Sequence, residues 1–73
     1  MLTKLRQLRK LNDITLDEVA IDTGLSVGYL NRIERGYIND VKNANKRKKL
    51  ENYIRRLEVK TKKELNKEMS LIN

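Results

Sequence analysis

The sequence predicts a small all-α protein, and three observations lead to that fold class. Leu, Ile and Val recur at spacings of three and four residues, which is the period of an amphipathic helix. The chain contains no proline and only 3 glycines among 73 residues, so long irregular loops are not expected. Two segments, Thr15–Glu18 and Thr61–Glu64, have the Thr-x-x-Glu pattern of a capping box, which marks the start of a helix.

The composition excludes several kinds of site. The chain has no cysteine and no histidine, so disulfides, zinc sites and imidazole acid–base catalysis lack their usual residues. Since a Gly-rich phosphate loop is also missing, we expect neither an enzyme nor a bound cofactor. The N-terminus lacks the apolar stretch of a secretion signal, and no apolar run approaches about 18 residues. We therefore expect a cytoplasmic protein that does not interact with a membrane.

The charge of the chain is unevenly distributed. The formal net charge is +7, but residues 1–36 carry six Lys or Arg against five Asp or Glu, whereas residues 37–73 carry eleven against five. A basic small domain is typical of a protein that binds nucleic acid or another anionic surface. An ordinary solvated surface is the alternative explanation.

Residues 14–36 predict two short helices, 16–23 and 27–35, joined by a tight turn. Each helix has a capping side chain before it and a glycine after it, namely Thr15 and Gly24 for the first, Ser26 and Gly36 for the second. Leu25 is the expected buried residue of the turn. Two helices joined by a short turn that contains glycine form a helix-turn-helix, whose second helix can enter the DNA major groove.

Three runs of sequence carry a resemblance to a known family: L-R-Q-L-R-K at 5–10, T-L-D-E-V-A-I-D-T-G-L-S at 15–26 and Y-L-N-R-I-E-R-G at 29–36. They resemble the phage repressor/Cro (Xre-type) helix-turn-helix family, with no gap between residues 5 and 36. The resemblance implies a compact five-helix, lambda-repressor-like domain, here with one possible extra helical turn. It also implies that the helix over 27–35 is a recognition helix for double-stranded DNA.

The resemblance implies site residues as well. The expected contacts to base edges are Val27, Gly28, Tyr29, Asn31 and Arg32. The expected contacts to phosphates are Thr15, Leu16, Ser26 and Arg35. In addition, the position of Arg9 is one that forms an ion pair with the position of Glu34 in this family, which would tie the first helix to the recognition helix.

The side chains of the recognition helix indicate only part of its specificity. Arg32 has the planar fork that pairs with guanine O6 and N7, whereas Val27 can offer only apolar contact, most naturally to a thymine methyl group. Gly28 offers no side chain and weakens the helix. Two interpretations of this glycine remain open, a close approach of the backbone to DNA and a tolerated weak position.

Other parts of the N-terminal half give further expectations. The first helix should begin at Leu2 or Thr3 and end at Leu11, which should face inward together with Leu5 and Leu8. Within the second helix, the sequence departs from the family pattern at Ile21, where a polar residue is usual, and at Thr23, where a buried aliphatic residue is usual.

Beyond residue 36 the sequence predicts two further helices. Residues 37–45 are longer than the usual connection, so an extra helical turn from Asp40 is plausible, and Asn45 is the expected cap of a helix over 46–58. That helix carries one apolar stripe, formed by Leu50, Tyr53, Ile54 and Leu57, followed by Val59. The capping box at Thr61 is expected to open a last helix that ends near Ser70.

This last helix divides the chain, in our prediction, into a DNA-binding domain over 1–59 and a helical extension over 60–73. The narrow apolar stripe of the extension is too short to be stable alone, and family members commonly dimerise through C-terminal elements. We therefore expect a homodimer whose contact includes Leu65, Met69 and Ile72.

Four consecutive cations begin the helix over 46–58: Lys46, Arg47, Lys48 and Lys49. Positive charges at a helix start oppose the helix dipole, so a nearby anion would favour their retention. We expect some of them to contact phosphates, although a solvated basic run is the alternative.

The leading functional interpretation is a sequence-specific double-stranded DNA-binding transcriptional regulator, a small repressor or Cro-like switch protein of a phage, plasmid or other mobile element. As a dimer it would bind an inverted-repeat operator. The main alternative is an antitoxin or other interaction module that binds a partner protein through its C-terminal half. A binder that is indifferent to nucleic-acid sequence is a third possibility.

Overall fold

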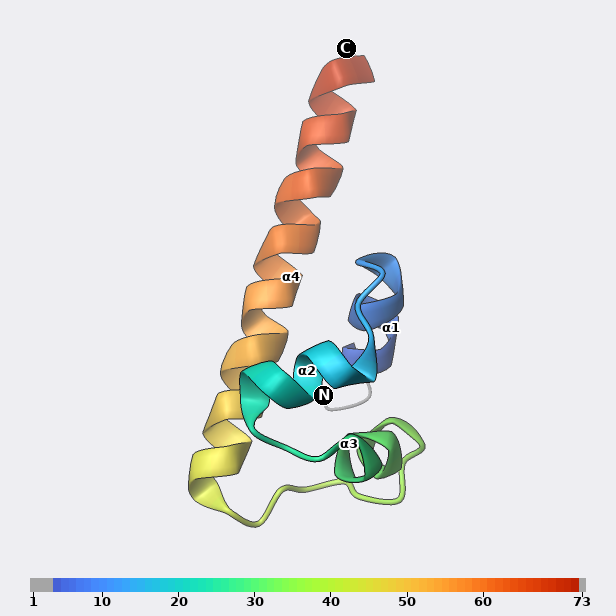
Figure 1. Ribbon diagram of the computed structural model, residues 1–73. Helices are drawn as coiled ribbons and strands as arrows, with labels where there is room; N and C mark the ends of the chain where they lie inside the picture. The colour runs from blue at the N-terminus through green and yellow to red at the C-terminus, as the bar shows by residue number, and fades with distance from the viewer. Residues whose placement is uncertain (1–3, 73) are drawn as a thin grey trace.

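The computed structural model describes residues 4–72, with the side chains of residues 4–66, and this part of the chain is all-helical (Figure 1). It contains four helices: α1 (Lys4–Leu11), α2 (Leu16–Thr23), α3 (Val27–Glu34) and α4 (Ala44–Ile72). The predicted all-α class and the two helices of the helix-turn-helix are thus confirmed. The predicted number of five helices is not confirmed, because α4 covers both of the helices that the sequence predicts beyond residue 45. The predicted start of the first helix at Leu2 or Thr3 lies outside the described residues.

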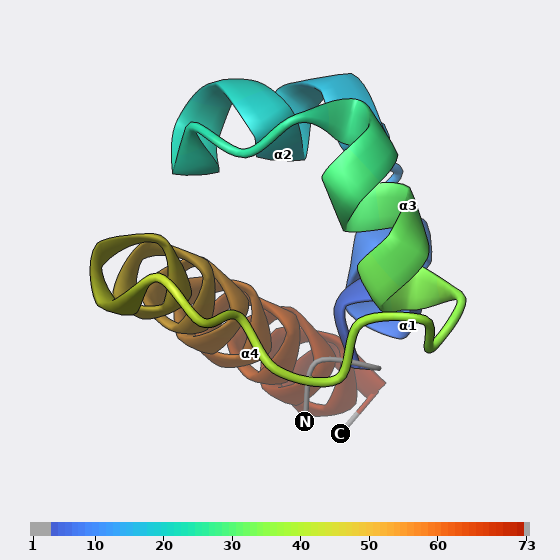
Figure 2. The ribbon, with the colours of Figure 1, turned by 90° about the horizontal axis from the view of Figure 1, so that it is seen from below.

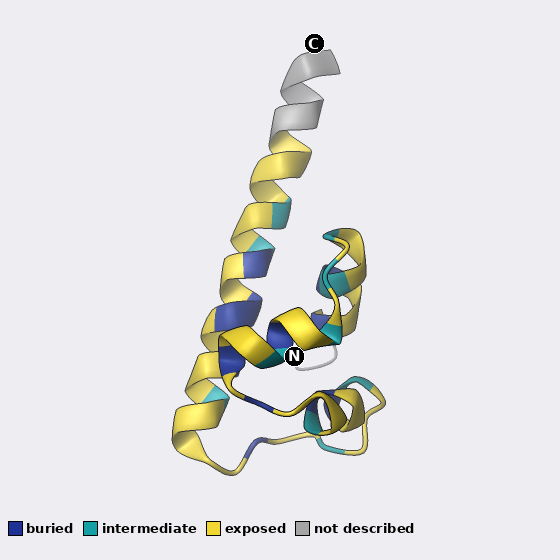
Figure 3. Ribbon diagram, in the orientation of Figure 1, coloured by how far each residue is buried: buried dark blue, intermediate teal, exposed yellow. Residues whose placement is uncertain are grey.

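The core lies where α1 and α2 pack on α4, while α3 packs on α2 (Figure 3). All four helices and both connections between α2 and α4 contribute to it, and its apolar side chains are Leu5, Leu8, Val19, Leu25, Leu30, Ile33, Val41, Leu50, Tyr53, Ile54 and Leu57. The predicted stripe of α4 is therefore a core face, although Val59 is 48% exposed. Among the described residues, no helix has both the length and the apolar composition needed to cross a bilayer.

The prediction that Leu11 faces inward is wrong, since its side chain is 71% exposed. Leu11 is the last residue of α1 and lies about 120° around the helix from Leu5 and about 60° from Leu8, beyond the edge of the buried face. The next residue, Asn12, turns inward instead. Its side-chain amide donates hydrogen bonds to the carbonyl of Leu8 at 2.7 Å and to the hydroxyl of Thr61 at 3.1 Å.

Left-handed residues end the first three helices. Gly24 (φ +74°) ends α2 and Gly36 (φ +83°) follows α3, as the sequence predicts. At the end of α1 the same conformation is adopted by Asp13 (φ +53°), a residue type that tolerates it. The amides after each helix bond back to its last turn: Ile14 N–H donates to the Arg9 carbonyl, and Tyr37 N–H to the Arg32 carbonyl, both at 2.9 Å.

Thr23 is buried although its side chain is polar, which explains the departure from the family pattern at this position. Its hydroxyl donates a hydrogen bond to the carbonyl of Val19 at 2.7 Å and accepts one from the amide of Leu25 at 3.3 Å. The hydroxyl is therefore satisfied inside the core, and it fixes Leu25, the middle residue of the turn between α2 and α3.

The expected extra helical turn from Asp40 is absent, because residues 38–42 form an irregular segment. Val41 in this segment is fully buried, and its carbonyl accepts a hydrogen bond from Arg47 at 3.3 Å. The expected cap, Asn45, is likewise wrong. Asn43 caps α4 instead, since its side-chain oxygen accepts from the amide of Lys46 at 3.1 Å.

The expected helix break before Thr61 is also absent, since α4 runs without interruption for 29 residues. The Thr61 hydroxyl does not cap a helix. It donates to the carbonyl of Leu57 at 2.7 Å and accepts the bond from Asn12, so it joins α4 to the end of α1. Beyond this point α4 extends past the rest of the protein, and residues 62–66 are exposed (Figure 1).

Candidate nucleic-acid interface

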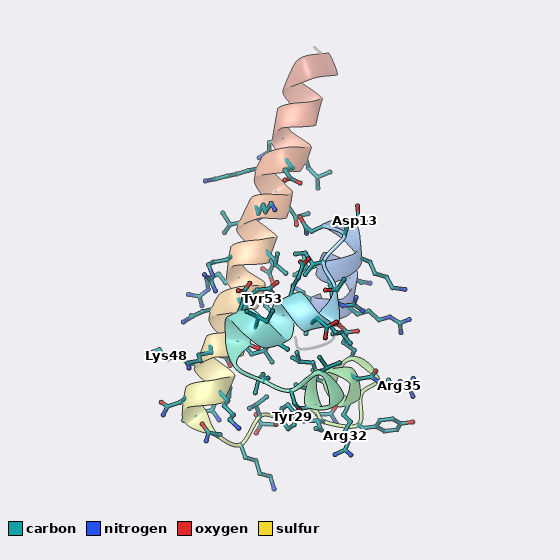
Figure 4. All side chains as sticks on the ribbon, in the orientation of Figure 1. Asp13, Tyr29, Arg32, Arg35, Lys48 and Tyr53 are labelled. Atoms are coloured by element: carbon teal, nitrogen blue, oxygen red, sulfur yellow. The ribbon has the colours of Figure 1, made fainter. Side chains whose placement is uncertain are left out.

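The outer face of α3 is exposed along its whole length. Leu30 and Ile33 are buried on the inner face. Val27, Gly28, Asn31, Arg32 and Arg35 are exposed, and Tyr29 is half-buried at the edge. Figure 4 shows Tyr29, Arg32 and Arg35 at the end of the molecule opposite the C-terminus, with Arg32 pointing outward. All five residues predicted to contact bases thus lie on α3, and four of them share its exposed face.

An ion pair fixes α3 relative to α1. Arg9 Nε donates to Glu34 Oε2 at 2.8 Å, and Arg9 Nη2 donates to Glu34 Oε1 at 2.9 Å. A third donor of the same side chain, Nη1, bonds the carbonyl of Ile14 at 3.1 Å. The hydrogen bonds to Glu34 raise the pKa of Arg9 above its ordinary value, so this guanidinium remains charged at every accessible pH.

This is the pair that the family resemblance implies for the two positions, and its geometry is bidentate. The side chains are 17% and 4% exposed, so water screens them little. Because it joins the end of α1, the start of the next segment and the end of α3, the pair sets the direction of the exposed face of α3.

Both helices of the motif begin with a hydroxyl cap. The Thr15 hydroxyl accepts from the amide of Glu18 at 3.2 Å, and the Ser26 hydroxyl accepts from the amide of Tyr29 at 3.1 Å. The capping oxygens are thus occupied within the protein. What these helix starts can offer an anion is the remaining N–H groups of their first turns.

A scan of family models finds one, described as helix-turn-helix, that matches residues 5–42. The chain belongs to this helix-turn-helix family. No curated protein and no solved structure matches the chain. The match spans more than half of the sequence and ends in the irregular segment before α4, so it includes the ion pair, both caps and the whole of α3. Members of this family are DNA-binding transcriptional regulators.

The basic run at the start of α4 borders the same end of the helix-turn-helix domain. Figure 2, which views that end, shows α3 and the start of α4 joined by residues 37–43, with α2 along a third side. The four cations do not form one surface, however. Lys46, Lys48 and Lys49 are exposed, and Figure 4 shows Lys48 pointing away from α3. Arg47 is half-buried against the carbonyl of Val41.

The exposed side of α2 has the opposite charge. Asp17, Glu18 and Asp22 are all exposed, and Ile21 between them is 82% exposed. α2 has no Lys or Arg. A helix start that is expected to contact a phosphate through Thr15 and Leu16 therefore carries two carboxylates in the same turn, which oppose an anion.

Two exposed residues after α3 are not among those that the sequence predicts for the interface. Tyr37 is 74% exposed immediately after the glycine that ends α3. Lys42 is exposed in the segment between α3 and α4. The available signal was their position, since both lie in the connection that follows the proposed recognition helix directly. Because this connection is longer than usual, its residues could not be matched to positions of the family pattern.

Proposed function

We propose that this protein is a sequence-specific double-stranded DNA-binding transcriptional regulator that inserts α3 into the major groove. The single observation that carries the proposal is the outer face of α3. It is exposed from end to end, it presents an arginine, and a half-buried bidentate ion pair holds its direction. A surface that only had to be soluble would not require that rigid attachment to α1.

The proposed base contacts divide by chemistry. Arg32 can donate two parallel hydrogen bonds to the O6 and N7 atoms of a guanine. Asn31 can bond an adenine edge, and the apolar side chain of Val27 suits a thymine methyl group. Tyr29 and Gly28 complete the set, with Tyr29 at the half-buried edge of the face.

The proposed phosphate contacts surround this face. They comprise backbone N–H groups at the helix starts near Thr15, Leu16 and Ser26, the side chain of Arg35, and cations of the run Lys46, Arg47, Lys48 and Lys49. Among the last four, Lys48 is the least suited to such a contact, because it points away from α3. Arg47 already has a backbone partner and contributes mainly through its charge.

We also propose a homodimer that binds an inverted repeat. On this view residues 1–59 form the DNA-binding domain, and the extension over 60–73 supplies the dimer interface. Support comes from the projection of α4 beyond Thr61 and from Leu65, which is 55% exposed there. The side chains of Met69 and Ile72 lie outside the described residues. Half-sites would then be centred about 10 bp, or a multiple of that, apart.

A small repressor or Cro-like switch protein of a phage, plasmid or other mobile element, acting on DNA in the cytoplasm, is the role that best fits one small regulator domain. The resemblance of residues 5–36 to phage repressors is the support for this context.

Selection of preferred duplexes from random-sequence DNA, followed by footprinting, tests the proposed function directly. We expect one enriched motif, arranged as an inverted repeat, with protection centred on it. No enrichment of any motif would contradict sequence-specific binding. If a partner protein co-purifies in stoichiometric amount and DNA binding is weak and indifferent to sequence, the antitoxin or interaction-module alternative replaces it.

Analytical ultracentrifugation tests the dimer separately. We expect a dimer at micromolar concentration or upon addition of the selected duplex, and Leu65→Lys should return the protein to monomer without unfolding it. A monomer under both conditions would contradict the dimer and leave the recognition helix untouched.

A further inference from the structure

Gly28 differs from the other two glycines of the chain because the fold does not require it. Gly24 and Gly36 have positive φ values, which L-residues rarely adopt. Gly28 has no such conformation, and a Cβ added to it would meet no atom within 4 Å. Alanine would therefore fit at residue 28 and would favour the helix.

The position of Gly28 on α3 is the outermost one. Each residue turns the helix by about 100°, which places Gly28 across the helix from the midpoint between the buried Leu30 and Ile33. One turn later on the same face come Asn31 and Arg32, both exposed, and Val27 stands beside it with 40% of its surface exposed. The result is a notch in the ridge that α3 would present to a DNA groove, with an apolar wall and two polar side chains at its border.

The chemistry of this notch limits what it can receive. A residue without a side chain offers no hydrogen bond to a base edge, and the neighbouring Val27 offers only apolar surface. Among the groups that base pairs expose in the major groove, the C5-methyl group of thymine is the apolar one. A notch lined by a glycine Cα and a valine side chain is complementary to a projecting methyl group, and it offers no partner to the hydrogen-bonding groups of the base edges.

We propose that Gly28 is a specificity-determining residue whose missing side chain receives a thymine methyl group, with Val27 as its apolar wall. The inference rests on the proposed function of α3 and adds to it the place of the thymine: its methyl group lies against Gly28, in an A·T pair next to the base pair contacted by Arg32. It also explains why a helix that would be stronger with alanine has glycine at its outermost position.

The test removes one methyl group from the DNA and, separately, adds one to the protein at residue 28. Uracil has the hydrogen-bonding edge of thymine without the C5-methyl group, so each thymine of the preferred duplex is replaced in turn by uracil. For the wild-type protein, we expect one such replacement per half-site to weaken binding about fourfold, the value of one buried methyl group. For Gly28→Ala, the added methyl group should collide with that of thymine and weaken binding to the thymine duplex about tenfold.

The decisive expectation is a reversal of preference. At the identified position Gly28→Ala should bind the uracil duplex more tightly than the thymine duplex, because removal of the DNA methyl group makes room for the protein one. The same variant should be more heat-stable than wild type by about 2–6 °C, since it strengthens the helix. Stability and DNA affinity thus move in opposite directions, and a folding defect cannot explain the weaker binding.

Asn52→Ala is the matched control, because it also raises helix propensity at an exposed position, on α4. It should raise the melting temperature and leave both DNA affinities unchanged. Equal affinity of Gly28→Ala and wild type for the thymine duplex would overturn the inference. So would an equal loss on the thymine and uracil duplexes, which would place a phosphate or sugar, not a thymine, against residue 28.

Failure of the proposed function would have a different signature. If the wild-type protein enriches no motif from random DNA, the function and the inference both fail. If it enriches a motif whose binding depends on Arg32 but not on any thymine methyl group, the function stands and only the inference fails.

Discussion

The helix-turn-helix unit, residues 14–36, and the following residues 37–72 differ in charge and in what fixes their structure. The unit carries two arginines against four carboxylates, whereas the second region carries eleven Lys or Arg against five Asp or Glu. The unit has hydroxyl caps, left-handed glycines and an ion pair to α1. The second region is one irregular segment and one long helix. We infer that the first region sets the direction of the recognition helix and the second supplies most of the attraction to phosphates.

The largest expected effect concerns the direction of α3. Glu34→Ala leaves the guanidinium of Arg9 without its partner in a poorly hydrated place, and Arg9→Ala leaves the Glu34 carboxylate, only 4% exposed, unpaired. Each single variant should lower the free energy of unfolding by about 3 kcal/mol, measured by urea denaturation. Each should also reduce discrimination between preferred and scrambled duplexes.

A double variant separates the effect of the two charges from the effect of the volume that the two side chains fill. Arg9→Met with Glu34→Leu removes both charges and keeps most of the volume, so it should recover much of the stability that either single change removes. Single variants that cost less than about 0.5 kcal/mol would show that the pair behaves as an ordinary surface salt bridge and does not position α3.

The second prediction concerns the attraction supplied by α4. Replacement of the basic run, Lys46 to Lys49, with glutamine should flatten the dependence of log affinity on log salt by about one unit for each phosphate that the variant no longer neutralises. Taken singly, Lys46→Gln should flatten the slope more than Lys48→Gln, because Lys48 points away from α3. An unchanged slope in the fourfold variant would assign the attraction to other residues.

The third prediction concerns the two carboxylates at the start of α2, whose removal should strengthen DNA binding but lower the stability of the fold. Asp17→Asn with Glu18→Gln removes two carboxylates from the start of α2, so DNA affinity at low salt should rise about fivefold. Stability should fall by about 0.3–1 kcal/mol per residue, because both charges favour the helix dipole. Glu51→Gln with Glu64→Gln makes the same change on α4 and serves as the control. Equal gains from both double variants would show that only net charge matters.

The smallest expected effect is a pH dependence of the packing between α2 and α4. Burial, followed by the charges of Asp22 and Glu18, raises the pKa of Tyr53 above its ordinary 10.0. The folded state therefore favours the neutral phenol. Its contribution to stability is complete below pH 10 and is lost as the pH rises from 10 through the higher folded-state pKa. Unfolding measured from pH 9 to 11.5 should show a smaller decline for Tyr53→Phe than for wild type, and equal declines would contradict this.

The two regions also differ in how far the sequence predicted them. In residues 14–36 the helix boundaries are decided by neighbours in sequence, a hydroxyl three residues before an amide or a glycine with positive φ, so the predictions are confirmed. In residues 37–72 the decisive interactions are distant. Asn43 and Asn45 are equally good caps locally, and burial of Val41 selects the first.

Thr61 shows the same limit most clearly. Its spacing to Glu64 is that of a capping box, but no glycine or proline follows residue 36, so nothing in the sequence stops the helix before it. Its hydroxyl instead donates a hydrogen bond to the carbonyl of Leu57 in the turn before it. It also accepts one from the side-chain amide of Asn12, which is 49 residues away. A sequence pattern with two structural meanings cannot be resolved without such a tertiary partner. Thr23 differs, because its buried hydroxyl is satisfied by local backbone groups, the carbonyl of Val19 and the amide of Leu25.

The measurement that tests the central claim most directly compares Arg32→Ala with Arg35→Ala on two duplexes, the preferred site and a scrambled one, at one salt concentration. If α3 reads bases, Arg32→Ala should lose about 1–3 kcal/mol of binding free energy on the preferred duplex and little on the scrambled one. Arg35→Ala should weaken both alike and reduce the salt slope by about one unit. An equal loss from Arg32→Ala on both duplexes would contradict base recognition by α3.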